Sequence, residues 1–128
     1  MSATNDLQRR ALQLLSAFAA QFSCIKAVHL FGSVARGATD KANDVDLFFE
    51  YTDDMPRSTE QVAAFTDFQG KLEGWLVVAT HTLGKPVKPC RPYYGERDEK
   101  IWQAIKATPP TASLGKAFIV PTPAVEKH

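Results

Sequence analysis

Two aspartates separated by one residue, Asp44 and Asp46, begin an apolar run that reads "NDVDLFFEY" at positions 43–51. In a strand, residues i and i+2 point to the same side, with Cα atoms about 6.6 Å apart. Two carboxylates on one face repel each other and resist burial, and a divalent cation relieves that conflict. Oxygen ligands suit Mg²⁺ or Mn²⁺, which in turn bind phosphates. The pair is therefore a candidate metal site, and the alternative is a solvated pair on an exposed strand face.

A second chemical feature comes just before the aspartates, in "HLFGSVARG" at positions 29–37. A glycine at the end of a strand, here Gly32, lets another group approach the backbone closely. A helix that begins at the next residue presents free N–H groups, which favour an anion such as phosphate. Ser33 adds a hydroxyl, and Arg36 can reach the same anion or brace the loop with its guanidinium donors. Alone, this segment also fits a plain strand-to-helix turn with a serine cap.

Together, the turn and the aspartates predict metal-assisted chemistry on phosphates. Two metal ions about 3.5–4 Å apart can clamp the attacking and leaving oxygens in phosphoryl or nucleotidyl transfer. We therefore predict that Asp44 and Asp46 are catalytic metal ligands. Gly32, Ser33 and Arg36 are the candidates to bind the phosphates of the substrate.

The elements that would position these residues follow from the hydrophobic pattern. Helical spacing predicts a helix over residues 5–22, and alternation over 44–51 predicts a strand whose aspartates share one face. "STEQ" at 58–61 resembles a capping box that begins a long helix, in which Gly70 and Gly74 either permit close packing or split the helix. We also expect a buried strand at 25–31, an edge strand or extended loop at 86–92 and a helix at 97–107.

Composition places these elements in one small domain. The chain has 128 residues, of which 45% are hydrophobic and 23% are charged, which suits a single core. We expect one domain over residues 1–110 and a proline-containing tail over 111–128 that is extended or partly disordered.

Charge and cysteine content exclude some classes of protein. The net charge of +1 gives no general reason to expect binding to membranes or to nucleic acid, except to a nucleic acid that serves as acceptor. No apolar stretch approaches the roughly 20 residues that a membrane span needs. The N-terminal residues do not resemble a secretory signal, and the two cysteines do not form a Cys-x-x-Cys motif. We therefore expect a cytoplasmic protein with reduced thiols.

The joint motif resembles that of the nucleotidyltransferase superfamily that includes DNA polymerase beta and kanamycin nucleotidyltransferase. Within it, the chain is most similar to the small prokaryotic minimal nucleotidyltransferases, whose pattern is Gly-Ser-x-x-Arg-Gly, a variable loop and then Asp-x-Asp-Leu. The matching residues are Gly32, Ser33, Arg36, Gly37, Asp44, Asp46 and Leu47, with Asn43 in the usual serine place. The order of helices and strands extends the resemblance over most of residues 5–107.

The resemblance implies an α/β (α+β) fold of the polymerase beta-like type, with a small mixed β-sheet, helices packed on one face and an open face for nucleotide. It implies ATP or another NTP as donor, held through Mg²⁺ or Mn²⁺ by Asp44 and Asp46, with Gly32 and Ser33 at the phosphates. An acceptor hydroxyl would attack the α-phosphate and release pyrophosphate. Members of this group often pair with a small helical protein of the HEPN type in toxin–antitoxin modules, and some modify that partner with AMP.

One position departs from the family pattern. The family usually supplies a third carboxylate from a later strand, and Lys88 stands at the matching position in "GKPVKPC". A lysine there would weaken cation binding, and Glu96, Asp98 and Glu99 are the alternative sources of an acid. Two functions remain open: a metal-dependent nucleotidyltransferase, or a weakly active or inactive nucleotide-binding antitoxin module that acts by binding its partner.

Overall fold

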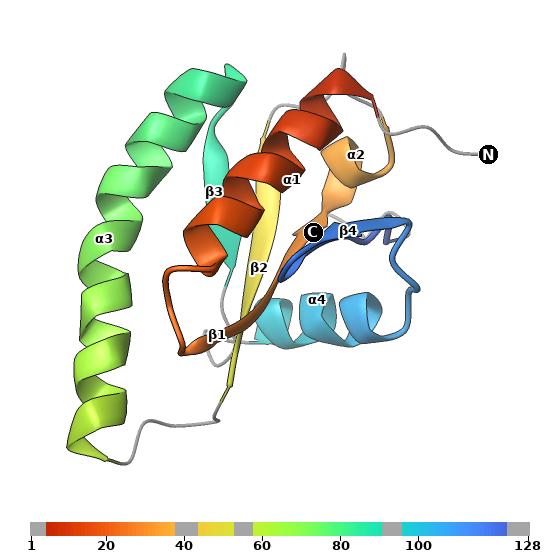
Figure 1. Cartoon of the computed structure of the whole chain (residues 1–128). Coiled ribbons are helices and arrows are strands. Elements are labelled where there is room, and N and C mark those ends of the chain that lie inside the picture. The colour runs from red at the N-terminus through yellow and green to blue at the C-terminus, as the bar shows by residue number, and fades with distance from the viewer. Residues whose placement is uncertain (1–4, 38–43, 53–57, 91–95, 123–128) are drawn as a thin grey trace.

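The computed structural model describes residues 5–37, 44–52, 58–90 and 96–122. Helices and strands alternate along most of the described chain (Figure 1). In chain order the elements are α1 (Asp6–Ala19), β1 (Ile25–Phe31), α2 (Gly32–Ala35), β2 (Val45–Tyr51), α3 (Thr59–Leu83), β3 (Val87–Cys90), α4 (Glu96–Lys106), β4 (Ala112–Leu114) and β5 (Ala117–Ile119).

The strands form a mixed five-stranded sheet in the order β3-β2-β1-β5-β4. The neighbours β1 and β2 are antiparallel, as are β4 and β5, whereas β3 runs parallel to β2 and β5 runs parallel to β1. The proline-containing strand β3 lies at an edge, where a missing backbone N–H does not interrupt a central ladder. The small mixed sheet and the α/β fold class expected from the sequence are therefore confirmed.

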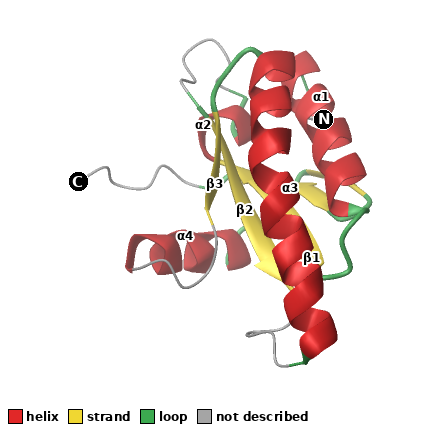
Figure 2. Ribbon diagram, turned by 90° about the vertical axis from the view of Figure 1, so that its left-hand side faces the viewer, coloured by secondary structure: helices red, strands yellow, loops and turns green. Residues whose placement is uncertain are grey.

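The sheet has helices on both sides (Figure 2). On one side, α1 and α3 cover the main core, which includes Leu15 and Phe68 from these helices and Leu30 and Phe49 from the sheet. On the other side, α4 packs over a smaller apolar cluster of five buried residues: Phe31, Phe48, Ile101, Ile105 and Val120. The resemblance implied helices on one face, whereas the helix expected at 97–107 covers part of the second face as α4.

Helix α3 runs without interruption from Thr59 to Leu83. The predicted capping box is present: the Ser58 side chain accepts a hydrogen bond from the Gln61 N–H, and the Gln61 side chain accepts one from the Ser58 N–H. Gly70 and Gly74 neither split the helix nor permit a close contact, because a Cβ atom at either position would meet nothing within 4 Å.

The C-terminal residues require a correction. The tail expected over 111–128 contains β4 and β5, and β5 inserts between β1 and β4 as an integral strand of the sheet. Ala117 and Ile119 are buried in the main core on one face of β5, which is the alternation of a half-buried strand. The folded part of the domain therefore continues past residue 110. Within the described ranges, no helix has both the length and the apolar character needed to span a membrane.

Candidate active site

Asp46 on the second face of β2, and Asp44 directly before that strand, lie near the end of β1, where α2 begins. Asp46 pairs in register with Phe31, the residue that precedes Gly32. Gly32 has a φ of +78°, and a Cβ atom there would lie 2.5 Å from Oδ2 of Asp46. Both the backbone conformation and the available space therefore require glycine. The group that approaches the Gly32 backbone closely, as the sequence predicted, is the Asp46 carboxylate.

Lys88 lies beside both aspartates. It is the register partner of Asp46 on the parallel strand β3, so the two side chains share a face of the sheet. Its Nζ atom is 3.7 Å from Oδ2 of Asp44. The position at which a third carboxylate was expected therefore holds an ammonium group in contact with the site.

No third carboxylate joins the pair in the part of the chain that the structure describes. There, no three or more histidine, cysteine, aspartate or glutamate side chains gather closely enough to hold a metal ion. Glu96, Asp98 and Glu99 lie in the first turn of α4, and the Glu99 carboxylate accepts a hydrogen bond from Gln103 on the same helix. Glu50 is also occupied, since it contacts His29 and Lys26.

Asp46 interacts electrostatically with the charged groups around it. Burial, followed by the negative charge of Asp44, raises the pKa of Asp46 above its ordinary value. Three cations, Arg97, Lys88 and Arg36, oppose that rise. A group that is partly withdrawn from water beside a like charge is a frequent feature of functional sites. The two aspartates are thus close enough to interact, and they lie in a predominantly cationic surrounding.

Arg97 is a site residue that the sequence reading missed. It lies at the N-terminal end of α4, and its charge acts on Asp46 more strongly than that of Lys88 or Arg36. In the sequence it belongs to the mixed run "ERDEK" and reads as an ordinary solvated position. Only the packing of α4 across the sheet reveals its proximity, so no local sequence signal identifies it.

The turn that carries Gly32 and Ser33 is fixed from two distant parts of the chain. The buried Gln8 side chain of α1 donates from Nε2 to the carbonyl oxygens of Val34 at 2.8 Å and Ala35 at 3.1 Å. Arg36 Nη1 donates to the carbonyl oxygen of Thr122 at 3.0 Å. Of the two roles predicted for Arg36, bracing the chain is therefore the one with a direct contact.

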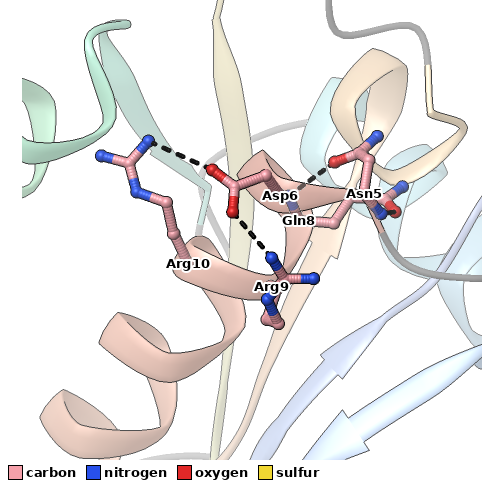
Figure 3. Close-up of polar contacts among 5 residues, drawn as sticks. All are labelled: Asn5, Asp6, Gln8, Arg9 and Arg10. Atoms are coloured by element: carbon pink, nitrogen blue, oxygen red, sulfur yellow. Dashed lines mark hydrogen bonds and ion pairs between the residues drawn. The ribbon is translucent and has the colours of Figure 1, made fainter.

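Gln8 is itself held by the start of α1 (Figure 3). Its backbone N–H donates to Oδ1 of Asn5 at 2.8 Å, and its Oε1 accepts from the Asn5 N–H at 3.0 Å. Asp6 in the same turn pairs with Arg9 and Arg10, and Arg10 also donates to the carbonyl oxygen of Thr82 near the end of α3. The first turn of α1 therefore links α2 to α3.

The remaining titratable groups near this face have structural surroundings. His29 contacts Glu50 at 3.1 Å and stacks on Phe118, and burial lowers the pKa of its imidazole. Burial, and then the charge of Asp98, raises the pKa of the Cys90 thiol to about 11. A thiol that remains protonated at neutral pH is a poor nucleophile, so Cys90 adds no nucleophile to the site.

Comparison with known proteins agrees with this fold. A family model described as "Nucleotidyltransferase domain" matches residues 12–113. No match was found among curated proteins or among solved structures.

Because the match covers most of the chain, the protein belongs to the nucleotidyltransferase domain family, consistent with the polymerase beta-like superfamily. Gly32, Asp44, Asp46 and Lys88 lie within the matched range. Membership supports nucleotidyl transfer as the general function of the domain.

Proposed function

We propose that the protein binds ATP or another NTP through a divalent cation at Asp44 and Asp46 and transfers the nucleoside monophosphate to an acceptor hydroxyl. The observation that carries the proposal is the arrangement of these carboxylates beside the Gly32 turn, with Lys88, Arg97 and Arg36 around them. Cations suit a triphosphate, whereas two bare carboxylates would repel it.

The carboxylates fit one Mg²⁺ or Mn²⁺ ion. Both ions prefer oxygen ligands, and Mg²⁺ is commonly held by one or two carboxylates with substrate phosphates and water completing its shell. The raised pKa of Asp46 reflects burial and repulsion from Asp44, and a cation between the two groups would relieve the repulsion. Such an ion supplies Lewis-acid polarisation of a phosphate oxygen and orients the triphosphate.

The reaction exchanges one bond at the α-phosphorus for another. The acceptor oxygen forms a bond to the α-phosphorus and loses its proton to solvent, while the bond between that phosphorus and the bridging oxygen breaks and releases pyrophosphate. Gly32 and Ser33 provide backbone and hydroxyl groups for the triphosphate, and Arg36 maintains the turn through Thr122. Arg97 and Lys88 offset the negative charge of the leaving pyrophosphate.

A protein hydroxyl is the acceptor that we favour. The resemblance to antitoxin-type minimal nucleotidyltransferases makes a small helical protein of the HEPN type the natural partner, to which AMP would be attached in the cytoplasm. A second candidate function is a partner-binding antitoxin module with little turnover. Lys88 favours that candidate, because it occupies the place of a group that would complete the metal site or accept the acceptor's proton. General-base assistance is typically worth about 10²–10⁴-fold in rate.

Calorimetric titration with ATP tests the nucleotide-binding step. We expect binding with Mg²⁺ and at least about 10-fold weaker binding without it, since the carboxylates then repel the triphosphate. The double variant Asp44→Asn, Asp46→Asn should lose the dependence on Mg²⁺. The matched control is Asp67→Asn, which removes an exposed aspartate of α3, and it should bind like the wild type. Equal affinity with and without Mg²⁺ in the wild type contradicts the proposal.

Transfer is tested separately with ATP labelled at the α-phosphate. Label that becomes covalently attached to a partner protein, with release of pyrophosphate, supports the enzyme. Tight Mg²⁺-dependent binding of ATP without any attachment to partner protein, nucleic acid or small alcohols supports the second candidate.

A further inference from the structure

Lys88 contacts Asp44 and lies in register with Asp46, as expected of a cation that belongs to the site. Its backbone is in register with Asp46, and its ammonium lies 3.7 Å from Oδ2 of Asp44. Its charge also lowers the pKa of Asp46, against the effect of burial. One ammonium thus acts on both carboxylates at once.

That position limits how many metal ions the site can hold. Two carboxylates can share one divalent ion with the phosphates of a nucleotide. A second ion about 3.5–4 Å from the first would need further oxygen ligands. The side chain that flanks both aspartates on β3 is instead Lys88, which repels an ion and offers no lone pair. The described part of the chain brings no other carboxylate to the pair.

We propose that the Lys88 ammonium takes the place of the second metal ion, so that the site works with one divalent cation and one built-in lysine cation. Arg97, at the start of α4, adds to the positive charge around Asp46. The catalytic role of Lys88 rests on the proposed function. The effect of Lys88 on metal binding can be measured without a nucleotide. The contact of Lys88 with a triphosphate would replace one of the charges that a second ion supplies.

A surface ion pair without function is the competing interpretation. The chain contains such a pair for comparison: Lys71 Nζ lies 3.3 Å from Oδ1 of Asp67 on one exposed face of α3. Lys88 differs because Asp44 is the more buried of the two aspartates, with 34% of its side chain exposed against 53% for Asp67. Lys88 also lies in register with a second carboxylate, Asp46. The Lys71 pair therefore provides a matched control.

The first arm of the test uses Mn²⁺ alone, followed by electron paramagnetic resonance of the free ion. Lys88→Asp should bind Mn²⁺ at least about 10-fold more tightly than the wild type, since it exchanges a repelling charge for an oxygen ligand. Lys88→Met should show a smaller gain, and Lys71→Asp should show none. Because the Lys88 side chain is 62% exposed, we expect these variants to retain the fold, and near-ultraviolet circular dichroism checks that expectation. Equal Mn²⁺ affinity in Lys88→Asp and Lys71→Asp overturns the inference.

The second arm adds an ATP analogue with a methylene bridge between the α- and β-phosphates. We expect one Mn²⁺ per chain in the wild type, and two magnetically coupled Mn²⁺ ions in Lys88→Asp. Two coupled ions in the wild type overturn the inference. Failure of the analogue to bind any variant would instead overturn the proposed function, and the first arm would still decide the role of Lys88.

Discussion

The two faces of β2 differ most at the end of the strand that leads to Asp44 and Asp46. On one face, Val45, Leu47 and Phe49 are at most 1% exposed and pack in the main core beneath α1 and α3. On the other, Asp44 and Asp46 are only partly buried, and burial raises the pKa of Asp46. The first face stabilises the fold. On the second face, partial burial of charged carboxylates lowers the free energy of unfolding.

Substitutions at neighbouring residues of β2 should therefore have different effects, depending on which face the side chain occupies. A truncation on the core face removes stability and, through it, every function. A truncation of Asp44 or Asp46 on the site face changes binding while leaving the fold intact, whereas Phe48 on the same face is buried in the smaller apolar cluster. The predictions below test that separation, beginning with the largest effect on stability.

Phe49→Ala should cost about 3–5 kcal/mol of unfolding free energy. Phe49 is fully buried, and its ring makes edge contacts with Phe18 and Phe68 from α1 and α3. The substitution would leave a cavity where the sheet packs against both helices. Urea denaturation followed by circular dichroism measures the loss. The exposed Val77→Ala of α3 is the control and should change stability by less than about 0.5 kcal/mol; a similar cost for both would contradict the assigned core.

Gly32→Ala should cost about 1–3 kcal/mol from its positive φ alone. The added Cβ also meets Oδ2 of Asp46, so the carboxylate must move away from the turn. We therefore expect the variant to lose Mg²⁺-dependent ATP binding as well as stability, measured by calorimetry and by thermal unfolding.

A double-mutant cycle separates the two causes. In the Asp46→Ala background, the carboxylate that Gly32→Ala encounters is gone, so the remaining cost should be that of the backbone conformation. A smaller loss of stability from Gly32→Ala in that background than in the wild type is expected. Identical losses in both backgrounds would show that the contact between the glycine and the aspartate is unimportant.

Gln8→Ala tests the link between the Gly32 turn and the distant helix α1. The substitution removes the Nε2 group that donates hydrogen bonds to the carbonyl oxygens of Val34 and Ala35. Both oxygens then lose their side-chain donor. We expect a cost of about 1–3 kcal/mol, as for a buried polar group left unsatisfied. Gln8→Glu tests the direction of these bonds, because a carboxylate of nearly the same shape cannot donate. Rescue of stability and ATP affinity by Gln8→Glu would contradict the assigned donor role.

Much of this arrangement can be predicted from the sequence because it follows from local pattern. Alternation in "DVDLFFEY" is sufficient to separate Asp44 and Asp46 from the core residues of β2, since side chains alternate in any strand. The capping box at Ser58 likewise predicts the start of α3, since its hydrogen bonds join residues three apart.

The missed features depend on contacts between distant segments. The strands β4 and β5 have three residues each, too few to show a reliable alternation, and β5 is specified by pairing with β1. Gln8 lies in the first turn of an amphipathic helix, where a polar residue is ordinarily solvated, and its partners are 26 and 27 residues away. Arg97 joins the site only through the packing of α4. Sequence pattern alone contains none of these contacts.

Asp46→Asn should have the smallest effect on stability, and the effect should be favourable. Burial and the charge of Asp44 raise the pKa of Asp46 in the folded chain, above the value of about 3.9 for an unperturbed aspartate. The folded state therefore binds the proton more tightly than the unfolded state does. Stability attributable to this group is greatest at low pH and decreases as the pH rises from about 4 through the raised pKa.

The amide in Asp46→Asn cannot ionise, so the variant avoids that decrease. At pH 7 its unfolding temperature should exceed that of the wild type, and at pH 3, where both side chains are neutral, the advantage should vanish. Mg²⁺-dependent ATP binding should be lost in the same variant. Asp67→Asn, at an exposed position on α3, supplies the comparison. A destabilised Asp46→Asn at pH 7 would mean that Arg97, Lys88 and Arg36 outweigh burial, which would reverse the relation between site and core on the two faces of β2.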